Sequence, residues 1–331
     1  MDPSNRNALI RRKAEDRDRL PTLPGELSSS RLWARGEVGR NRASDADPRS
    51  LEAFFPNRQQ GQLDMPFVTI DGDEFHIRTD GPEDAPALLL SNSLSSDLSM
   101  WDEQVPVWSK RFRVIRYDQR GHGRSVVTKG AYSMDRLGRD AVGVLDALGV
   151  RKAHWCGLSL GGMVGTWVLT HAPDRIGRAV LANTAAHMGP TELWNGRIET
   201  ARRGGMEALV EPTIERWFPE HFRKTAPDTM ERMRAMILRT PVEGYQGCCA
   251  AIRDMDQREA IRAVSHPVLV IIGARDPATK PADGELIASS IENAQRLTLD
   301  TAHISNIEQP EAFASAVLDF LSQQAERGRS A

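Results

Sequence analysis

The chain has 331 residues, 40% of them hydrophobic and 27% charged, and its 43 basic and 45 acidic side chains give a net charge of −2. This composition is typical of one or two globular domains with a full hydrophobic core. The balanced charge, without a basic cluster among aromatic residues, argues against a nucleic-acid partner, and the longest apolar run, Val268 to Ile272, is far too short to cross a membrane.

Residues 1–64 differ in composition from the rest of the chain. They are dense in charges of both signs, contain several prolines and a run of three serines at 28–30, and have few β-branched residues. Such a segment buries too little apolar surface to offset its ordering entropy, so we expect a disordered extension here and a short tail at 326–331. It lacks the apolar stretch of a secretion signal and has too many acids for an organelle presequence. Its removal is expected to leave Tm and turnover unchanged.

From Met65 onward, strand and helix patterns alternate. Eight short segments, several of them continuously apolar, predict strands of a mostly parallel sheet that is buried on both faces. They are 67–70, 74–79, 87–91, 112–117, 153–157, 178–182, 267–272 and 295–299. Apolar residues at helical spacing lie between them, for example over 137–148 and 313–321.

The alternation is interrupted once, at 187–265, where Trp, Met and Ile residues recur at helical spacing among charged residues without a strand-like run. We interpret this stretch as a helical cap inserted between two strands of a core formed by 65–186 and 266–325. The predicted fold class is α/β, with a mostly parallel eight-stranded sheet flanked by helices and carrying a helical cap.

The sequence Gly157-Leu158-Ser159-Leu160-Gly161 has the pattern of a nucleophilic serine on a tight turn. It follows a predicted strand directly and opens a predicted helix, and the glycines two positions to either side of Ser159 leave room for the turn. The helix N-terminus directs backbone N–H groups toward charge that develops beside the serine. The pattern also arises by chance and resembles a phosphate loop, but no lysine stands in the Walker position. The strand–turn–helix context favours Ser159 as nucleophile.

A serine nucleophile needs a base and an acid that orients the base. His303 follows the last predicted strand through a short loop, and Asp276 follows the strand at 267–272, so both leave the same edge of the sheet as Ser159. The chain order Ser159, Asp276, His303 is that of the strand–serine–helix hydrolases. The other histidines fall in strands, at helix ends, in the cap or, for His122, in a loop.

The tetrahedral oxyanion of acyl transfer needs two hydrogen-bond donors. We expect one to be the backbone N–H of Leu160, directly after the serine. The other is assigned to the backbone N–H of Leu94, in the loop that follows the strand at 87–91.

These motifs together resemble the α/β-hydrolase superfamily over residues 65 to about 324. Within it, the strings at 90–94, 97–101, 216–218 and 244–254 resemble the 3-oxoadipate enol-lactonases of the β-ketoadipate branch of aromatic catabolism. The Gly-Cys-Cys-Ala-Ala part of the last string is the most specific, because ordinary esterases do not share it. Ser95 departs from the pattern, since a glycine is common there.

The resemblance implies a serine hydrolase that opens the ring of 3-oxoadipate enol-lactone, a small anionic lactone, through an acyl-enzyme. The substrate carboxylate then needs a cation, and Arg216 beside Trp217 in the cap is our candidate pair, although an arginine on a cap helix is more often solvated. No residue cluster has metal-ligand spacing, so neither a metal nor an organic cofactor is expected. Three cysteines cannot form a disulfide framework, which favours a cytoplasmic protein.

Two other functions remain open at this point. One is a general carboxylesterase or a cofactor-free haloperoxidase-like hydrolase of the same fold, which would turn over a small neutral ester faster than the lactone. The other is a non-catalytic ligand-binding member of the fold, whose serine need not react with a fluorophosphonate. A dehalogenase or epoxide hydrolase is disfavoured, because those enzymes carry a carboxylate nucleophile where this chain has Ser159.

Overall fold

The computed structural model describes residues 67–323, so the extension predicted at 1–64 and the tail predicted at 326–331 lie outside the described residues. Eight strands form one sheet in the order β1-β2-β4-β3-β5-β6-β7-β8. They are β1 (Phe67–Ile70), β2 (Asp73–Asp80), β3 (Ala87–Ser91), β4 (Arg113–Tyr117), β5 (Ala153–Leu158), β6 (Ile176–Ala182), β7 (Val268–Gly273) and β8 (Ala294–Leu299). The β1–β2 and β2–β4 pairs are antiparallel and all later pairs are parallel. The predicted mostly parallel eight-stranded sheet is confirmed.

The central strands are buried on both faces, which explains their continuous apolar runs. Every residue of β3 and of β7 is buried, whereas in the edge strand β8 only Leu299 is buried and the others are exposed or half-buried. A strand covered by helices on both sides has no solvent-facing set of side chains, so its sequence does not alternate.

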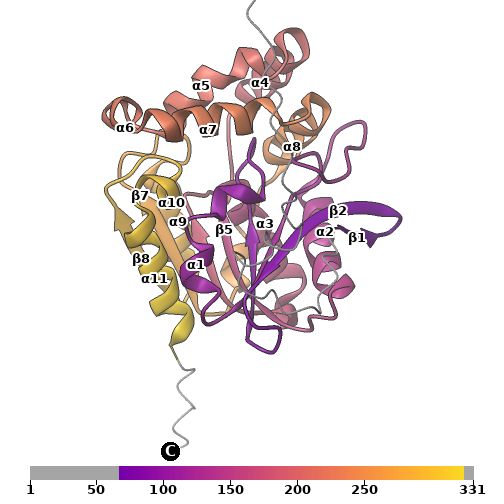
Figure 1. Ribbon diagram of the computed structural model, residues 1–331, viewed down its shortest axis with the longest axis vertical. Helices are drawn as coiled ribbons and strands as arrows, with labels where there is room; N and C mark the ends of the chain where they lie inside the picture. The colour runs from indigo at the N-terminus through magenta and orange to yellow at the C-terminus, as the bar shows by residue number, and fades with distance from the viewer. Residues whose placement is uncertain (1–66, 324–331) are drawn as a thin grey trace, which may run out of the picture. The chain divides into compact units, whose positions relative to one another are not determined.

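The helices outside the cap pack against this sheet and against one another (Figure 1). They are α1 (Val105–Trp108), α2 (Met134–Ala147), α3 (Leu160–His171), α9 (Pro281–Ser290), α10 (Ser305–Glu308) and α11 (Pro310–Ser322), with short 3₁₀ turns at Leu98–Trp101 and Pro173–Arg175. Helix α2 begins where the Ser133 hydroxyl accepts the Arg136 N–H, and a left-handed glycine, Gly149, follows its end. Within 67–323, no helix has both the length and the apolar character needed to cross a bilayer.

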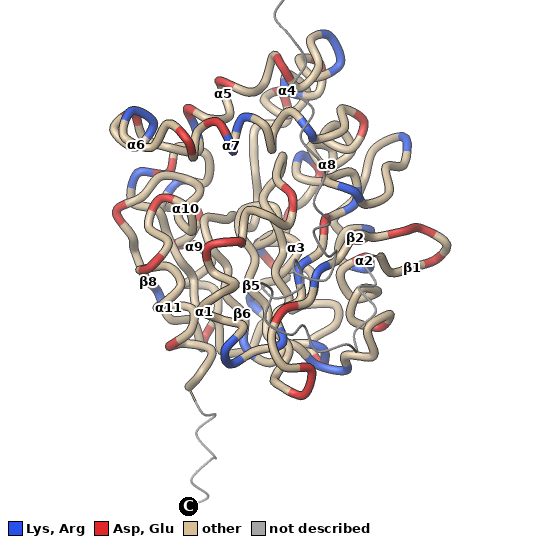
Figure 2. Tube along the Cα trace, viewed as in Figure 1, with Lys and Arg blue, Asp and Glu red and all other residues tan. Residues whose placement is uncertain are grey.

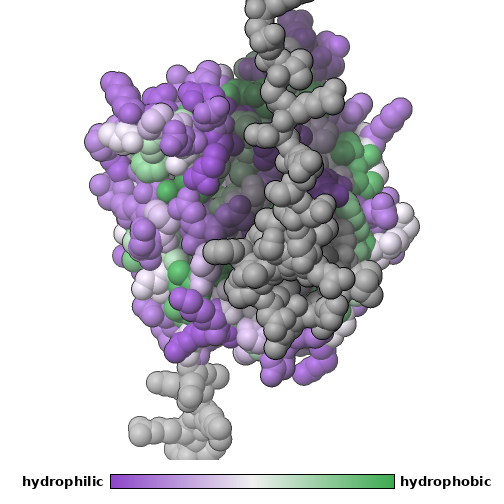
Figure 3. All heavy atoms as spheres, in the orientation of Figure 1, coloured by the Kyte–Doolittle hydropathy of each residue, from purple (hydrophilic) through white to green (hydrophobic). Residues whose placement is uncertain are grey.

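Between β6 and β7 the chain forms five helices and a 3₁₀ turn in place of strands. They are α4 (Thr191–Gly204), α5 (Glu207–Trp217), α6 (Glu220–Thr225), α7 (Pro227–Leu238), α8 (Val242–Asp254) and the turn Ala260–Ala263. Trp194, Trp217 and Met233 from these helices are buried. Their outer faces carry charges of both signs (Figure 2), and the surface over α6 and α7 is largely hydrophilic (Figure 3). The sequence pattern of 187–265 thus reflects helices with one apolar face each.

Parallel pairing brings the carboxyl ends of several strands to one edge of the sheet. Ser91 at the end of β3 lies opposite Gly157 in β5, and Ala182 at the end of β6 lies opposite Leu158 and Ile271. The loops that follow β3, β5, β7 and β8 therefore leave the sheet at the same edge. In Figure 1 the cap helices lie over this edge. In open α/β sheets this is where ligands bind.

Candidate active site

Ser159 occupies the strained turn between β5 and α3. Its φ of 57° and ψ of −115° lie in a region that residues with a side chain rarely adopt, and its carbonyl accepts the N–H groups of Gly162 and Met163. A Cβ on Gly157 would collide with the Gly161 carbonyl, and one on Gly161 would collide with the Ser91 carbonyl. Only glycine fits at these two positions, because the turn presses β5, α3 and β3 together. The Ser159 hydroxyl is thereby raised above the edge of the sheet.

The structure brings Ser159, His303 and Asp276 into one hydrogen-bonded chain. His303 Nε2 lies 2.9 Å from Ser159 Oγ, and His303 Nδ1 lies 2.8 Å from Asp276 Oδ2. All three residues are buried. Asp276 follows β7 and His303 follows β8, as the sequence order led us to expect. The proton on Nδ1 faces the carboxylate, which leaves Nε2 free to accept a proton from the serine.

Asp276 is stabilised as a carboxylate by a full set of donors. Its Oδ1 accepts the backbone N–H groups of Ala278 and Thr279, and its Oδ2 accepts the Thr279 hydroxyl at 2.7 Å and the Asn183 amide at 3.1 Å. Burial acts to raise the pKa of Asp276, but the neighbouring His303 and these hydrogen bonds outweigh it and hold the pKa below its ordinary value. The carboxylate is therefore charged at neutral pH and orients the imidazole.

The cap holds the loop that carries His303. The backbone carbonyl of Trp217, at the end of α5, accepts the N–H groups of His303 and Ile304 at 3.1 and 3.3 Å. The predicted cap residue Trp217 thus contacts the predicted base through its main chain, while its side chain lines the same pocket as Ser159.

The two predicted oxyanion donors come from the residue after Ser159 and from the loop after β3. Leu160 is the first residue of α3, and Leu94 lies in the loop after β3 and lines the pocket together with Ser159. Within residues 67–323, neither the Leu94 nor the Leu160 backbone N–H is engaged by another protein group. Both are therefore available to an oxygen on a substrate.

Asn92 anchors the base of this loop. Its amide donates to the Tyr117 carbonyl at 2.9 Å and accepts from the Trp101 indole N–H at 2.9 Å. Gln119 donates to the Asn92 carbonyl at 2.6 Å. The loop is thus fixed to the end of β4 before it turns toward Ser159, and this explains why the motif places an amide side chain at position 92.

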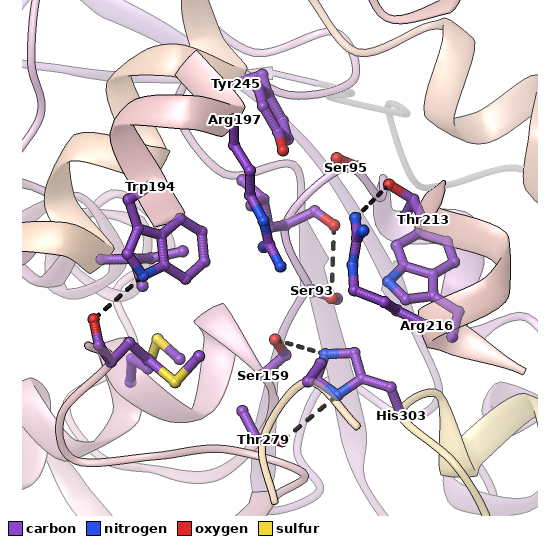
Figure 4. A pocket seen from close by; sticks show the side chains of 16 residues that line it. Ser93, Ser95, Ser159, Trp194, Arg197, Thr213, Arg216, Tyr245, Thr279 and His303 are labelled. Atoms are coloured by element: carbon purple, nitrogen blue, oxygen red, sulfur yellow. Dashed lines mark hydrogen bonds between the residues drawn. The ribbon is translucent and has the colours of Figure 1, made fainter. Parts of the chain in front are cut away.

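A pocket opens above Ser159 between the sheet edge and the cap (Figure 4). Two guanidinium groups reach it, Arg197 from α4 and Arg216 from α5. Arg216 donates to the Thr213 hydroxyl at 2.9 Å, and Arg197 lies over the Trp194 ring, 4.5 Å from its centroid. Within the described part of the chain, neither forms an ion pair with a carboxylate. Burial, with a smaller contribution from the nearby Arg197 charge, lowers the pKa of Arg216 to about 10, so it stays cationic at neutral pH.

Several residues around the site were not indicated by the sequence patterns. Arg197, Trp194 and Tyr245 line the pocket from the cap, and Asn183 and Thr279 support Asp276. On a charged cap helix, nothing in the local sequence separates Arg197 from its solvated neighbours. Across 67–323, no three His, Cys, Asp or Glu side chains gather as ligands for a metal ion.

Comparison with known proteins gives consistent matches over the described fold. Residues 86–310 match the family described as alpha/beta hydrolase fold. The chain is 40% identical to 3-oxoadipate enol-lactonase 2 of Acinetobacter baylyi over 239 residues, which cover 72% of this chain and 90% of the relative. It is 42% identical in sequence to the enol-lactonase from Burkholderia xenovorans LB400. The crystal structure of that enzyme matches with a TM-score of 0.77 over 78% of this chain and 100% of that chain. A thermophilic esterase from Thermogutta terrifontis, solved with malate bound, is 29% identical over 77% of this chain and 96% of its own, with a TM-score of 0.72.

Proposed function

Because the chain belongs to the alpha/beta hydrolase family, we propose that it is a serine hydrolase that opens the ring of 3-oxoadipate enol-lactone in the β-ketoadipate pathway. The observation that carries this proposal is the 2.9 Å contact between His303 Nε2 and Ser159 Oγ, in a pocket with two guanidinium groups that have no carboxylate partner among residues 67–323. The first feature provides a nucleophile for an ester carbonyl, and the second provides a partner for a carboxylate. The enol-lactone has both groups.

The first half-reaction forms an acyl-enzyme. Ser159 Oγ attacks the lactone carbonyl carbon while His303 Nε2 takes its proton, and Asp276 stabilises the imidazolium. The Leu94 and Leu160 N–H groups hold the oxyanion of the tetrahedral intermediate. The bond between the carbonyl carbon and the ring oxygen then breaks. The ring oxygen leaves as an enolate, takes the proton from His303, and the enol converts to the ketone.

The second half-reaction hydrolyses the acyl-enzyme. Water attacks the ester carbonyl and gives a proton to His303, the oxyanion again occupies the Leu94 and Leu160 donors, and Ser159 leaves with the proton from His303. The product is 3-oxoadipate. No step requires a metal ion or an organic cofactor. The buried free cysteines Cys156, Cys248 and Cys249 fit a reducing compartment, so the cytoplasmic location remains part of the proposal.

The carboxymethyl group of the lactone is assigned to the arginines. Arg216 and Arg197 approach the space above Ser159 from different helices (Figure 4), so a ring placed with its carbonyl at Ser159 directs its side chain between them. A carboxylate between two guanidinium groups forms charge-assisted hydrogen bonds and relieves the repulsion between the two cations. The Trp217 side chain offers an apolar wall for the ring.

Loss of the enol-lactone absorbance with purified protein tests the proposal. We expect turnover of the lactone with a larger kcat/KM than that of a small neutral ester such as p-nitrophenyl acetate. The reverse order would favour a general carboxylesterase. A protein that hydrolyses neither compound and does not react with a fluorophosphonate would be a ligand-binding member of the family.

A further inference from the structure

The turn that presents Leu94 contains a residue in an unfavourable conformation. Ser95 has a φ of 67°, in the left-handed region that favours glycine. The Ser96 N–H and hydroxyl both donate to the Ser93 carbonyl, which closes a four-residue turn with Ser95 at its third position. A left-handed third residue is the mark of a type II turn, for which glycine is the ordinary choice. A serine at position 95 therefore does not by itself favour the type II turn that this segment adopts.

A histidine outside the Ser159–His303–Asp276 chain supports this conformation. The Ser95 N–H donates to His122 Nε2 at 3.0 Å, and both residues are buried. Because Nε2 accepts, the ring proton belongs on Nδ1, which lies 3.3 Å from the Arg120 carbonyl. Burial lowers the pKa of His122, against smaller opposing effects of the Arg120 carbonyl and of Asp118 and Asp97, and so the ring stays neutral and able to accept.

His122 is itself held by the cap. Gly121 packs so closely against Gly244 of α8 that a Cβ on either would collide with the other backbone. Cys248 of the same helix lies with its Sγ 3.6 Å from the Arg120 carbonyl and 3.9 Å from His122 Nδ1. Gly244 and Cys248, both within the string at 244–254, thus let α8 approach the loop that carries His122.

We propose that His122 is a positioning residue that holds the turn bearing the Leu94 N–H in its oxyanion-binding conformation; the inference rests on the proposed function. In the alternative type I turn, the peptide between Leu94 and Ser95 is turned over and φ of the third residue is negative. The Ser95 N–H then no longer faces His122, and because ψ of Leu94 changes with the flip, the loop that carries the Leu94 N–H loses its fixed geometry. Serine prefers the alternative, and the bond to His122 selects the type II turn.

The test first removes the His122 Nε2 acceptor and then replaces Ser95 by glycine, which adopts a positive φ without that hydrogen bond. His122→Phe keeps an aromatic ring but leaves the Ser95 N–H without a partner. We expect kcat to fall about 10- to 100-fold with little change in KM. Deleting an oxyanion donor lowers kcat roughly 10²- to 10³-fold, and a displaced donor costs less than that. Adding Ser95→Gly should restore at least about tenfold of kcat, because glycine adopts a positive φ without support. His122→Gln, whose amide oxygen can accept, should retain more of kcat than His122→Phe.

The matched control is His154→Phe. His154 Nδ1 also accepts a backbone N–H, from Arg178 at 3.1 Å, but it lies near the start of β5, far along the strand from Ser159. This variant should keep kcat. If His122→Phe does not fold, His122→Leu, which also lacks an acceptor, provides the same comparison with and without Ser95→Gly.

Unchanged kcat in His122→Phe, or a loss that Ser95→Gly does not recover, would overturn the inference. All variants are assayed with p-nitrophenyl acetate as well as the lactone, because the oxyanion donors serve any acyl substrate. A wild type active on the ester but not on the lactone would count against the proposed function and leave the result for His122 intact.

Discussion

Replacing Arg216 should separate binding of the substrate carboxylate from the chemistry at Ser159. Arg216 is half-buried, donates only to Thr213 and has no carboxylate partner within the described residues. In Arg216→Gln the substrate carboxylate loses its ion pair with the guanidinium and keeps at most a hydrogen bond from an uncharged amide, while Arg197 remains. Since a hydrogen bond to a charged group contributes about 1.5–3 kcal/mol, and 1.36 kcal/mol corresponds to a factor of ten, kcat/KM for the enol-lactone should fall roughly 10- to 150-fold.

The assay uses two lactones that differ only in charge. The second is the same enol-lactone ring with a methyl group in place of the carboxymethyl group, which has the reacting carbonyl but no carboxylate. Arg216→Gln should change kcat/KM for this neutral lactone by less than about threefold, since the substitution affects neither the binding of the ring nor the reaction at Ser159. Arg202→Gln, an exposed arginine of α4 paired with Glu199, is the control and should leave both substrates unchanged. An equal loss on both lactones, or no loss on the anionic one, would refute the assignment.

Three further predictions concern the buried charges. Asp276→Asn should lower kcat by about 10⁴-fold with a folded protein, because the imidazole loses the group that sets its tautomer; a loss below about tenfold contradicts the role. The pKa of Asp276 is depressed, so its carboxylate stabilises the fold above pH 4 and this contribution disappears as the pH falls through the lowered pKa. In urea unfolding, the stability difference between wild type and Asp276→Asn should therefore shrink between pH 7 and pH 3; a constant difference argues against it. Asp140→Ala leaves the buried Arg120 without its bidentate partner and should lower the free energy of unfolding by about 3–5 kcal/mol. A loss under about 1 kcal/mol would show that the remaining ion pair with Asp73 is enough to compensate the Arg120 charge.

The fold could be predicted from local sequence patterns, because runs of apolar residues indicate which strands are buried. The apolar runs at 87–91 and 267–272 correspond to β3 and β7, which are covered on both faces. The glycines around Ser159 correspond to contacts that no side chain could enter. Asp276 and His303 could be identified because β5, β7 and β8 run parallel, so their carboxyl ends lie at the same edge of the sheet. Such features are encoded within a few residues of each position.

The rest of the site depends on tertiary contacts that no local pattern contains. Arg197 faces the pocket only because α4 packs above the sheet edge, and Asn183 reaches Asp276 across 93 positions of sequence. The sequence assigned no role to His122, and only the structure placed its Nε2 beside the Ser95 N–H. The unusual serine at position 95 was visible in the sequence, but its partner was not.

The most direct test of the account compares wild type with Ser159→Ala on 3-oxoadipate enol-lactone. Without the hydroxyl no acyl-enzyme can form, and the rate of enol-lactone absorbance loss should fall about 10⁶-fold, toward the uncatalysed rate, while Tm is retained. A Ser159→Ala protein that still opens the lactone within about tenfold of the wild-type rate would show that the reaction does not pass through Ser159.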